Sequence, residues 1–306
     1  MAHEPMAFFD GRLMPLKDAT INIATHAFNY GTGVFEGLRA YWNQAQQELF
    51  IVQPGPHYER LLRSSRVLHI EVPYRVDELV EWTIELLKAN HFEEDVYIRP
   101  LAYKADPAVK VGLSGIQSAF AMYAIPMGDY VPTGGIRVQV SSWRRIADNM
   151  IPSRAKVTGA YVNAALSSEQ AKMDGYDEAI LLTDEGQVAE ASSSNLFMVR
   201  RGVLVTPPVT DDILEGITRD LVITLARDHD IVVEERSIDR TELYSADELF
   251  LCGTGVQLAA VVEVDRRPVA MGEAGPITRR LQEAYMALVR GDAPRYRRYV
   301  VPVYHR

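Results

Sequence analysis

The spacing of apolar residues predicts both helices and strands along the chain. A period near 3.6 residues is typical of a helix with one buried face, and alternation or a short apolar run is typical of a strand. Helical spacing appears at three sets of positions, which are Tyr58, Leu61, Leu62 and Leu68; Leu79, Val80, Ile84 and Leu87; and Ile217, Leu221, Val222 and Leu225. Strand patterns appear at residues 96–101, 119–125, 137–141 and 196–199. We therefore expect an α/β protein in which helices and strands are mixed.

A stretch rich in turn-forming residues divides this pattern into two parts. Residues 126–135 (PMGDYVPTGG) combine prolines and glycines between two strand-like runs, which is typical of a link between domains. We expect a small N-terminal α/β domain over residues 1–125, a linker over 126–135, and a larger domain with a C-terminal tail over 136–306. The cleft between the two domains is the expected place of the active site.

Composition narrows the classes of partner. The 306 residues carry a net charge of −9, which disfavours nucleic acid because binding a phosphate backbone needs a basic face. The single cysteine, Cys252, excludes internal disulfides and cysteine-clustered zinc sites, and the histidines show no pair at metal-ligand spacing. No apolar segment approaches the length of a membrane span. These features predict a cytoplasmic protein without a metal, a membrane or a nucleic acid, which acts on small molecules.

Lysines are few, so the search for a reactive amine is short. The five that lie in helical or loop-like polar stretches, and that we expect to be solvated, are Lys17, Lys88, Lys104, Lys110 and Lys172. Lys156 lies instead in the locally uncharged run AKVTGA (155–160), where burial would keep part of the amine unprotonated and nucleophilic. Lys156 is therefore the candidate nucleophile.

One carboxylate has a position suited to a buried role. Glu190 follows the turn DEGQ (184–187) and precedes the apolar run 196–199, so we expect it where a hairpin returns to the core. The alternative is an exposed glutamate at a strand end. The serines at 192–194, followed by Asn195, would suit either a tight turn packed against a ring or an ordinary loop.

Three stretches could bind a phosphate group. Gly216, Ile217 and Thr218 precede a helical pattern, so their backbone N–H groups are the unpaired donors of a helix N-terminus. Thr254, between two glycines, could add a hydroxyl and further amides. Arg60 could add a positive charge, although a solvated helix arginine is the alternative. The glycine pairs Gly31–Gly33 and Gly253–Gly255 both lack the third glycine of a dinucleotide-binding fingerprint.

A lysine, a carboxylate and a phosphate-binding turn are the groups that pyridoxal phosphate requires. Its aldehyde is held by an amine as a Schiff base, its ring nitrogen stays protonated beside a carboxylate, and its phosphate suits a charge-poor turn. The run 190–219 resembles the signature of class-IV aminotransferases, which are fold-type-IV pyridoxal-phosphate enzymes. The resemblance is closest to branched-chain amino acid aminotransferases, and it rests on residues 30–41 (YGTGVFEGLRAY), 97–101 (YIRPL), 156–161 (KVTGAY) and 214–220 (LEGITRD).

The resemblance implies a role for each residue of the cofactor site. Lys156 would bind the cofactor aldehyde, Tyr161 would hydrogen-bond its 3′-oxygen, and Glu190 would pair with its ring nitrogen. The phosphate would be held by Arg60, Gly216, Ile217, Thr218 and Thr254.

Substrate contacts follow from strand geometry and from the resemblance. Tyr97 and Arg99 lie two residues apart in a predicted strand, so both polar tips face one pocket and could receive a carboxylate. The resemblance implies that Tyr97 and the turn at Gly255 bind the α-carboxylate, and that Arg99 admits the second carboxylate of glutamate. It also places the apolar side chain of the substrate against the residues Tyr30, Phe35 and Gly37.

We therefore predict a transaminase that moves the amino group of branched-chain L-amino acids to 2-oxoglutarate in a double-displacement cycle. One alternative keeps the fold and changes the reaction, to that of a D-amino acid or (R)-amine transaminase or of an aminodeoxychorismate lyase. The turn GTGVQ (253–257) keeps the amine-accepting alternative open, because in the enzymes that the chain resembles small alanines and an acid usually follow the threonine. Another alternative is a non-catalytic binding module. The resemblance also implies a homodimer at least, possibly a hexamer, in which a loop near residues 104–115 of one subunit completes the site of its neighbour.

Overall fold

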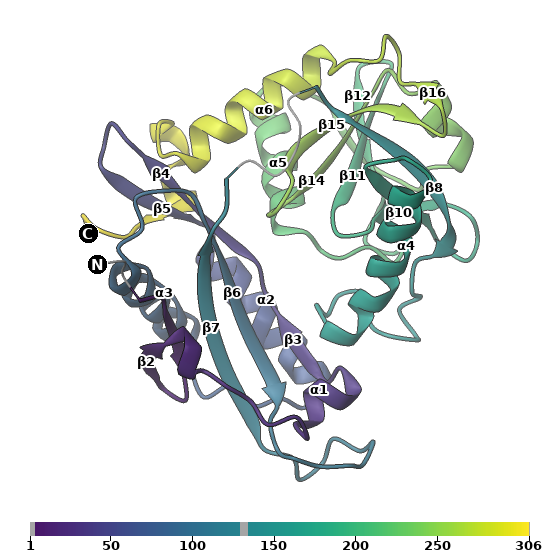
Figure 1. The fold of residues 1–306 in the computed structure, drawn as a ribbon. Coiled ribbons are helices and arrows are strands. Elements are labelled where there is room, and N and C mark those ends of the chain that lie inside the picture. Colours follow the sequence, from purple (N-terminus) through teal and green to yellow (C-terminus); the bar gives the residue numbers. More distant parts are fainter. Residues whose placement is uncertain (1–3, 129–133, 306) are drawn as a thin grey trace. The chain divides into compact units, whose positions relative to one another are not determined.

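The computed structural model describes residues 4–128 and 134–305 (Figure 1). The three predicted helices are α2 (Pro54–Val67), α3 (Val76–Asn90) and α5 (Ile217–Asp228). The four predicted strands are β6 (Val96–Lys104), β7 (Ser118–Pro126), β8 (Ile136–Arg144) and β11 (Asn195–Arg200). The mixed α/β fold class expected from the apolar spacing is confirmed. None of the helices in the described part of the chain is both long and apolar enough to cross a membrane.

The chain divides into two compact units. The first consists of Met1–Gly128, Ala155–Gly159 and Ala287–Arg306, and the second of Asp129–Arg154 and Ala160–Met286. The domain boundaries expected from the sequence stay a prediction, because residues 129–133 of the expected linker lie outside the described residues.

An antiparallel sheet organises the first unit. Its strand order is β17-β5-β4-β6-β7-β1-β2, and β3 also pairs with β6. Helix α2 packs against β3 and β6, while α3 packs against β1 and β7. The other elements of this unit are β1 (Met6–Phe9), β2 (Arg12–Pro15), α1 (His26–Tyr30), β3 (Gly33–Phe35), β4 (Leu38–Asn43), β5 (Glu48–Val52), β17 (Val300–Pro302) and the 3₁₀ turns Leu16–Asp18 and Pro294–Tyr299. The C-terminal residues thus extend a sheet made by the N-terminal part of the chain.

Lys104, at the end of β6, is buried, so the expectation that it is solvated is wrong. Only 4% of the residue is exposed, and its Nζ donates hydrogen bonds to the backbone carbonyls of His69 and Ile116. These carbonyls, one just beyond α2 and one just before β7, compensate the ammonium group for its lost hydration. Lys104 therefore fastens the two ends of the connection between β6 and β7.

A mixed sheet organises the second unit. Its strand order is β10-β9-β8-β15-β14-β11-β12-β13, and β16 pairs with β15. Helix α4 packs against β8 and β9, and α5 packs against β13 and β14. The other elements are α4 (Tyr161–Met173), β9 (Glu178–Leu182), β10 (Val188–Ala191), β12 (Val203–Thr206), β13 (Val233–Glu235), β14 (Glu248–Gly253), β15 (Gln257–Val264), β16 (Arg267–Pro268) and the 3₁₀ turn Arg240–Ser245. Helix α6 (Pro276–Val289) and the 3₁₀ turn Thr158–Ala160 have residues in both units. The pairs β8–β9, β8–β15 and β12–β13 are parallel. The other strand pairs of this sheet are antiparallel.

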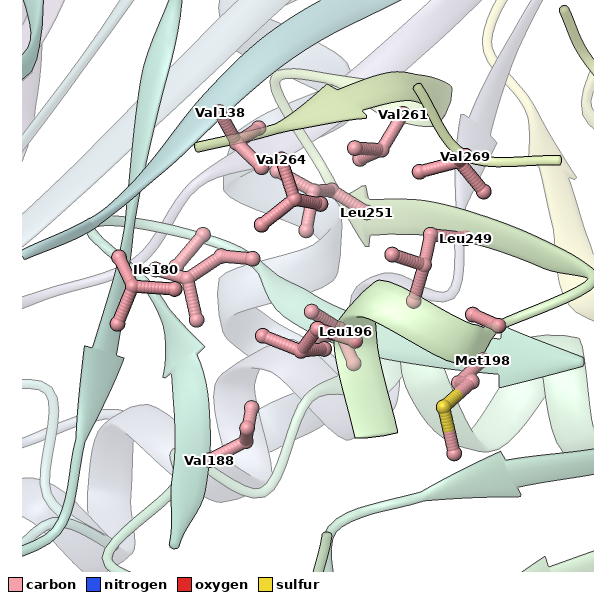
Figure 2. Close-up of a cluster of buried hydrophobic side chains, with 14 of the residues drawn as sticks. Val138, Ile180, Val188, Leu196, Met198, Leu249, Leu251, Val261, Val264 and Val269 are labelled. Carbon is pink, nitrogen blue, oxygen red and sulfur yellow. The ribbon is translucent and has the colours of Figure 1, made fainter. Parts of the chain in front are cut away.

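Alternate residues of the central strands form the core of the second unit. Figure 2 shows the cluster on one face of the sheet, which includes Leu196, Met198, Leu249, Leu251 and Val261. The intervening residues Phe197 and Phe250 are paired across β11 and β14 and stack with ring centres 5.1 Å apart. Because apolar residues are buried on both faces, these strands are almost continuously apolar. The packed core positions the polar residues at the ends of β11 and β14.

Candidate active site

Glu190 lies in β10 and is buried, in agreement with the hairpin position expected for it. Asn195 donates to its Oε2 through Nδ2 at 2.8 Å, and the backbone N–H of Leu214 donates to the same oxygen at 3.1 Å. The guanidinium of Arg145 lies 2.8 Å from Oε1. A buried carboxylate needs such partners to stay ionised. The arrangement fixes a negative charge at the end of the core, where it could face a protonated ring nitrogen.

The N-terminus of α5 presents main-chain donors beside this carboxylate. Gly216 is the N-cap residue, and no side chain caps the helix there. A Cβ atom at position 216 would lie 1.9 Å from Oδ1 of Asn195, so only glycine fits this place. The N–H groups of Ile217 and Thr218 belong to the first turn, whose donors lack partners within the helix. Such donors fit a phosphate group.

The turn between β14 and β15 adjoins the same cluster. It contains Thr254 and Gly255, and it begins at Gly253, where an added Cβ would lie 3.4 Å from the Cβ of Ser194. Ser194 is buried, and its Oγ has no hydrogen-bond partner among the described residues. A buried hydroxyl without a partner is costly. The start of α5 without a side-chain cap, the tight fit of Gly216 against Asn195 and the unsatisfied Ser194 hydroxyl together fit a bound polar group.

Lys156 lies in the first unit, against β3. The N–H of Phe35 donates to the carbonyl of Lys156 at 3.1 Å, and the N–H of Lys156 donates to Oγ of Ser64 at 3.1 Å. The Lys156 Nζ lies 5.1 Å from the centre of the Phe35 ring. Main-chain contacts on both sides therefore fix the base of this side chain. Tyr161 follows five positions later as the first residue of α4, in the second unit.

Phe35 also contacts the predicted carboxylate-binding pair. The guanidinium carbon of Arg99 lies 4.4 Å from the Phe35 ring centre, and Nη2 of Arg99 donates to the Tyr97 hydroxyl at 2.9 Å. A Cβ at Gly37 would lie 2.2 Å from that hydroxyl oxygen, so the glycine makes room for Tyr97. The structure thus brings together Phe35, Gly37, Tyr97 and Arg99. Tyr30 ends α1, is 40% exposed and has its ring beside His26.

Arg60 is buried in the first unit, so the alternative of a solvated helix arginine is excluded. Its Nε donates to Oε1 of Glu36 at 2.6 Å, and its Nη2 donates to Oε2 at 2.8 Å. His57 donates to Oε2 through Nδ1 at 2.7 Å. Burial alone would raise the pKa of Glu36, but Arg60 and His57 hold that pKa well below its ordinary value. Burial lowers the pKa of His57, which leaves a neutral ring at neutral pH.

Several of these polar partners were not found from the sequence. Arg145 and His57 belong to no motif, and Glu36 lies in the run 30–41 without a predicted role of its own. Each of the three contacts a residue that is distant in the chain. Asn195 was noted only as part of a turn, yet it contacts Glu190 and excludes any residue but glycine at position 216. The one available signal was the spacing of His57 and Arg60, which places both on the same face of a helix.

The chain is similar to known aminotransferases over almost its whole length. Residues 33–264 match the family model described as amino-transferase class IV. The probable branched-chain-amino-acid aminotransferase of Aquifex aeolicus (strain VF5) is 50% identical over 300 residues, which cover 97% of this chain and 96% of that protein. Two solved structures are similar throughout. The branched-chain aminotransferase of Thermoproteus uzoniensis with norvaline matches with a TM-score of 0.95, 44% identity and coverage of 98% of this chain and 100% of that one. The enzyme of Thermobaculum terrenum in its PLP-form matches with a TM-score of 0.94, 38% identity and 99% coverage of both chains.

Proposed function

We propose that this chain, which belongs to the class-IV aminotransferase family, reversibly transfers the amino group of L-leucine, L-isoleucine or L-valine to 2-oxoglutarate, with pyridoxal 5′-phosphate as its cofactor. The observation that carries the proposal is the group Phe35, Tyr97 and Arg99, which combines an apolar ring with a guanidinium and a hydroxyl. Similar relatives and solved structures with branched-chain aminotransferase names support it.

The proposal gives Lys156 and Glu190 the central parts in proton transfer. Pyridoxal phosphate, when bound, supplies an aldehyde that accepts the amino group and a protonated ring that takes up carbanion charge. Lys156 would hold the aldehyde in the resting enzyme, and its freed amine would then move a proton between the substrate α-carbon and the cofactor C4′. Glu190, held by Arg145 and Asn195, would keep the proton on the ring nitrogen. Tyr161 would donate to the 3′-oxygen.

The cofactor phosphate would be bound by main-chain donors and one cation. The N–H groups of Ile217 and Thr218 at the uncapped start of α5 suit an anion, and Gly216 leaves no side chain in the way. Thr254 would add a hydroxyl, and Arg60 would add the positive charge. The orphaned Ser194 hydroxyl beside the Thr254 turn supports a polar ligand at this end of the second unit.

One pocket would serve two unlike substrates. With a branched-chain donor, the apolar side chain would lie against Phe35 and Tyr30, beside the Tyr97 hydroxyl that fits against Gly37. With glutamate or 2-oxoglutarate, the second carboxylate would accept hydrogen bonds from Arg99, and the pairing of Arg99 with Tyr97 fixes the direction of that guanidinium. The turn at Gly255 would bind the α-carboxylate, and an added Cβ there would meet no atom within 4 Å.

We further propose that the enzyme is cytoplasmic and forms at least a homodimer, possibly a hexamer. The connection between β6 and β7 supports an assembly, because Val109 and Val111 on it are 89% and 81% exposed. Apolar side chains this exposed favour a covering partner. A second copy of the chain would cover them, and the same connection would complete the neighbouring site.

A spectral titration tests the function. The purified, cofactor-loaded protein is mixed in turn with L-leucine, L-glutamate, D-alanine and (R)-1-phenylethylamine, and the absorbance of the lysine-bound cofactor is followed. Bleaching by L-leucine and L-glutamate is the expected result, because of the four compounds only these two combine an α-carboxylate, the L configuration at the α-carbon and a side chain that the proposed pocket accepts. Bleaching by D-alanine or the amine alone would contradict the substrate assignment and leave the cofactor assignment intact.

A further inference from the structure

Glu36 carries a charge in the interior of the first unit. Its side chain has no exposed surface, and it lies in the chain between Phe35 and Gly37, two residues of the proposed substrate pocket. Its carboxylate accepts two hydrogen bonds from Arg60, one from His57 and one from the N–H of Gly37 at 3.3 Å. A carboxylate is buried so completely only when its partners satisfy both oxygens.

The geometry of these bonds fixes the direction of the Arg60 side chain. Nε and Nη2 lie on one edge of the planar guanidinium, and each donates to a different oxygen of Glu36. Such a two-point contact sets the plane of the group and its rotation. His57 lies one turn earlier on α2 and holds the same carboxylate from the side. Glu36 is thereby locked by the helix whose arginine it orients.

The electrostatic balance argues against a role in attraction alone. A carboxylate beside Arg60 offsets the positive charge that a phosphate group would need, and His57 adds none while its ring is neutral. A pair kept only for stability could be replaced by apolar residues at little cost. What the carboxylate provides is a fixed direction for the guanidinium.

We propose that Glu36 is a positioning residue for the cofactor phosphate, which acts by orienting Arg60 and is itself held by His57. The proposal rests on the proposed function, in which Arg60 binds that phosphate. Because Glu36 lies between Phe35 and Gly37, it also connects α2, the helix that carries Arg60, to the backbone of the substrate pocket. The cofactor and the substrate side chain are thus aligned by one buried group.

Phosphate-specific affinity tests this role on the apoenzyme. Dissociation constants for pyridoxal 5′-phosphate and for pyridoxal, which lacks the phosphate, are measured for the wild type, Glu36→Gln, Arg60→Gln and the double variant. Glutamine keeps the size of Glu36 but replaces one accepting oxygen with a donor. We expect Glu36→Gln to weaken pyridoxal phosphate binding about tenfold, as is usual when the support of a ligand-binding group is removed, and to leave pyridoxal binding unchanged.

A double-mutant cycle shows whether the effect passes through Arg60. In the Arg60→Gln background, Glu36→Gln should change neither affinity further, because no guanidinium remains to be oriented. Should Glu36→Gln fail to fold, His57→Leu keeps the carboxylate and removes one donor. Its expected effect is a fall of about threefold in pyridoxal phosphate affinity alone, which corresponds to one lost hydrogen bond.

Asp95→Asn is the matched control. Asp95 pairs with Arg290 through two bonds of 2.9 Å in the same unit, and neither residue has a proposed role in the site. This variant should lose stability without changing the ratio of the two affinities. An unchanged ratio of the two affinities in Glu36→Gln would overturn the inference about Glu36. If Arg60→Gln still weakened the binding of pyridoxal phosphate relative to pyridoxal, the assignment of Arg60 to the phosphate would stand. An unchanged ratio in Arg60→Gln would overturn that phosphate assignment as well.

Discussion

The two units hold their proposed site residues by different means. In the first unit, cationic side chains are oriented by other side chains: Glu36 holds Arg60, and the Phe35 ring lies beside Lys156 and Arg99. In the second unit, the groups on offer are a carboxylate and main-chain N–H donors. There Asn195 contacts Glu190 and packs against Gly216 at the start of α5. The first unit supplies cationic side chains, and the second supplies one carboxylate and a backbone shaped by Gly216.

The difference teaches which substitutions each unit can tolerate. A charged side chain that is oriented by an ion pair loses its fixed orientation when the charge of its partner is removed. A main-chain donor survives any change of side chain other than to proline, which has no N–H, and it is otherwise displaced only when a new atom pushes the backbone away. Charge substitutions should therefore act most strongly in the first unit, and glycine substitutions in the second. Glu190 is the exception, because it is a charge in the unit that otherwise relies on its backbone.

Removal of the Lys156 amine is expected to have the largest effect. Lys156→Ala leaves the main-chain contacts of this segment intact and takes away the proposed acid and base. Turnover with L-leucine should fall at least about a thousandfold, measured by steady-state release of the 2-oxo acid. Lys172→Ala on the exposed face of α4 is the control and should retain full activity. Normal turnover in Lys156→Ala would refute the assignment of the reactive amine.

Loss of the charge on Glu190 should come next. Glu190→Gln can no longer keep a proton on the ring nitrogen, and it leaves the Arg145 guanidinium, 2.8 Å away in the parent, without its carboxylate. The proton-transfer rate should fall about a hundredfold, while cofactor affinity changes much less. Stopped-flow absorbance with L-leucine reports the rate, and equilibrium dialysis reports the affinity. If affinity fell and the rate held, Glu190 would bind the cofactor without tuning it.

A glycine substitution tests the backbone side of the comparison. In Gly216→Ala the new Cβ meets Oδ1 of Asn195, whose amide is committed to Glu190 and to the carbonyl of Leu214. The helix start must shift, so we expect stability to fall by about 1–3 kcal/mol and cofactor affinity to fall with it. Urea unfolding and cofactor titration measure the two effects.

Gly55→Ala is the matched control for that substitution. Gly55 lies in the first turn of α2, and an added Cβ would meet no atom within 4 Å. Alanine there should change stability much less than Gly216→Ala does, because its helix propensity is opposed only by the restriction that Pro56 places on the residue before it. Equal behaviour of the two alanine variants would mean that the close fit of Gly216 against Asn195 does not matter.

The sequence predicted the helices, the strands and the buried hairpin position of Glu190 better than the contacts that hold the buried side chains. Helices, strands and the burial of Glu190 follow from local periodicity and turn chemistry, which neighbouring residues carry. The burial of Lys104 does not, because its acceptors at His69 and Ile116 are distant in the chain. For the same reason the sequence does not predict the role of Glu36, whose partner Arg60 is 24 positions away. The local sequence pattern predicts the helix or strand in which a side chain lies, and tertiary contacts decide which groups bind it.

The smallest expected effect concerns a buried glutamate of the first unit without a proposed part in the reaction. The carboxylate of Glu48 accepts hydrogen bonds from four backbone N–H groups, those of Leu49, Val303, Tyr304 and His305. It therefore fastens the C-terminal residues beside β5. Glu48→Gln keeps the shape and removes the charge, so we expect a loss of about 1–2 kcal/mol in unfolding free energy at neutral pH and no change in the spectrum of the bound cofactor.

The pH dependence of that loss sharpens the comparison with Glu36. Burial alone would raise the pKa of Glu48, but the backbone donors together hold it below its ordinary value. A carboxyl with a lowered pKa in the folded state stabilises the fold above its unfolded pKa, about 4.3, and this contribution disappears as pH falls through the folded value. The stability gap between parent and Glu48→Gln, measured by urea unfolding at a series of pH values, should therefore be constant near neutrality and shrink in acid. A gap that does not change with pH would mean that shape, rather than the charge that faces these backbone donors and the His305 ring 3.3 Å away, secures the C-terminal segment. Glu48 would then differ from Glu36, whose charge faces Arg60.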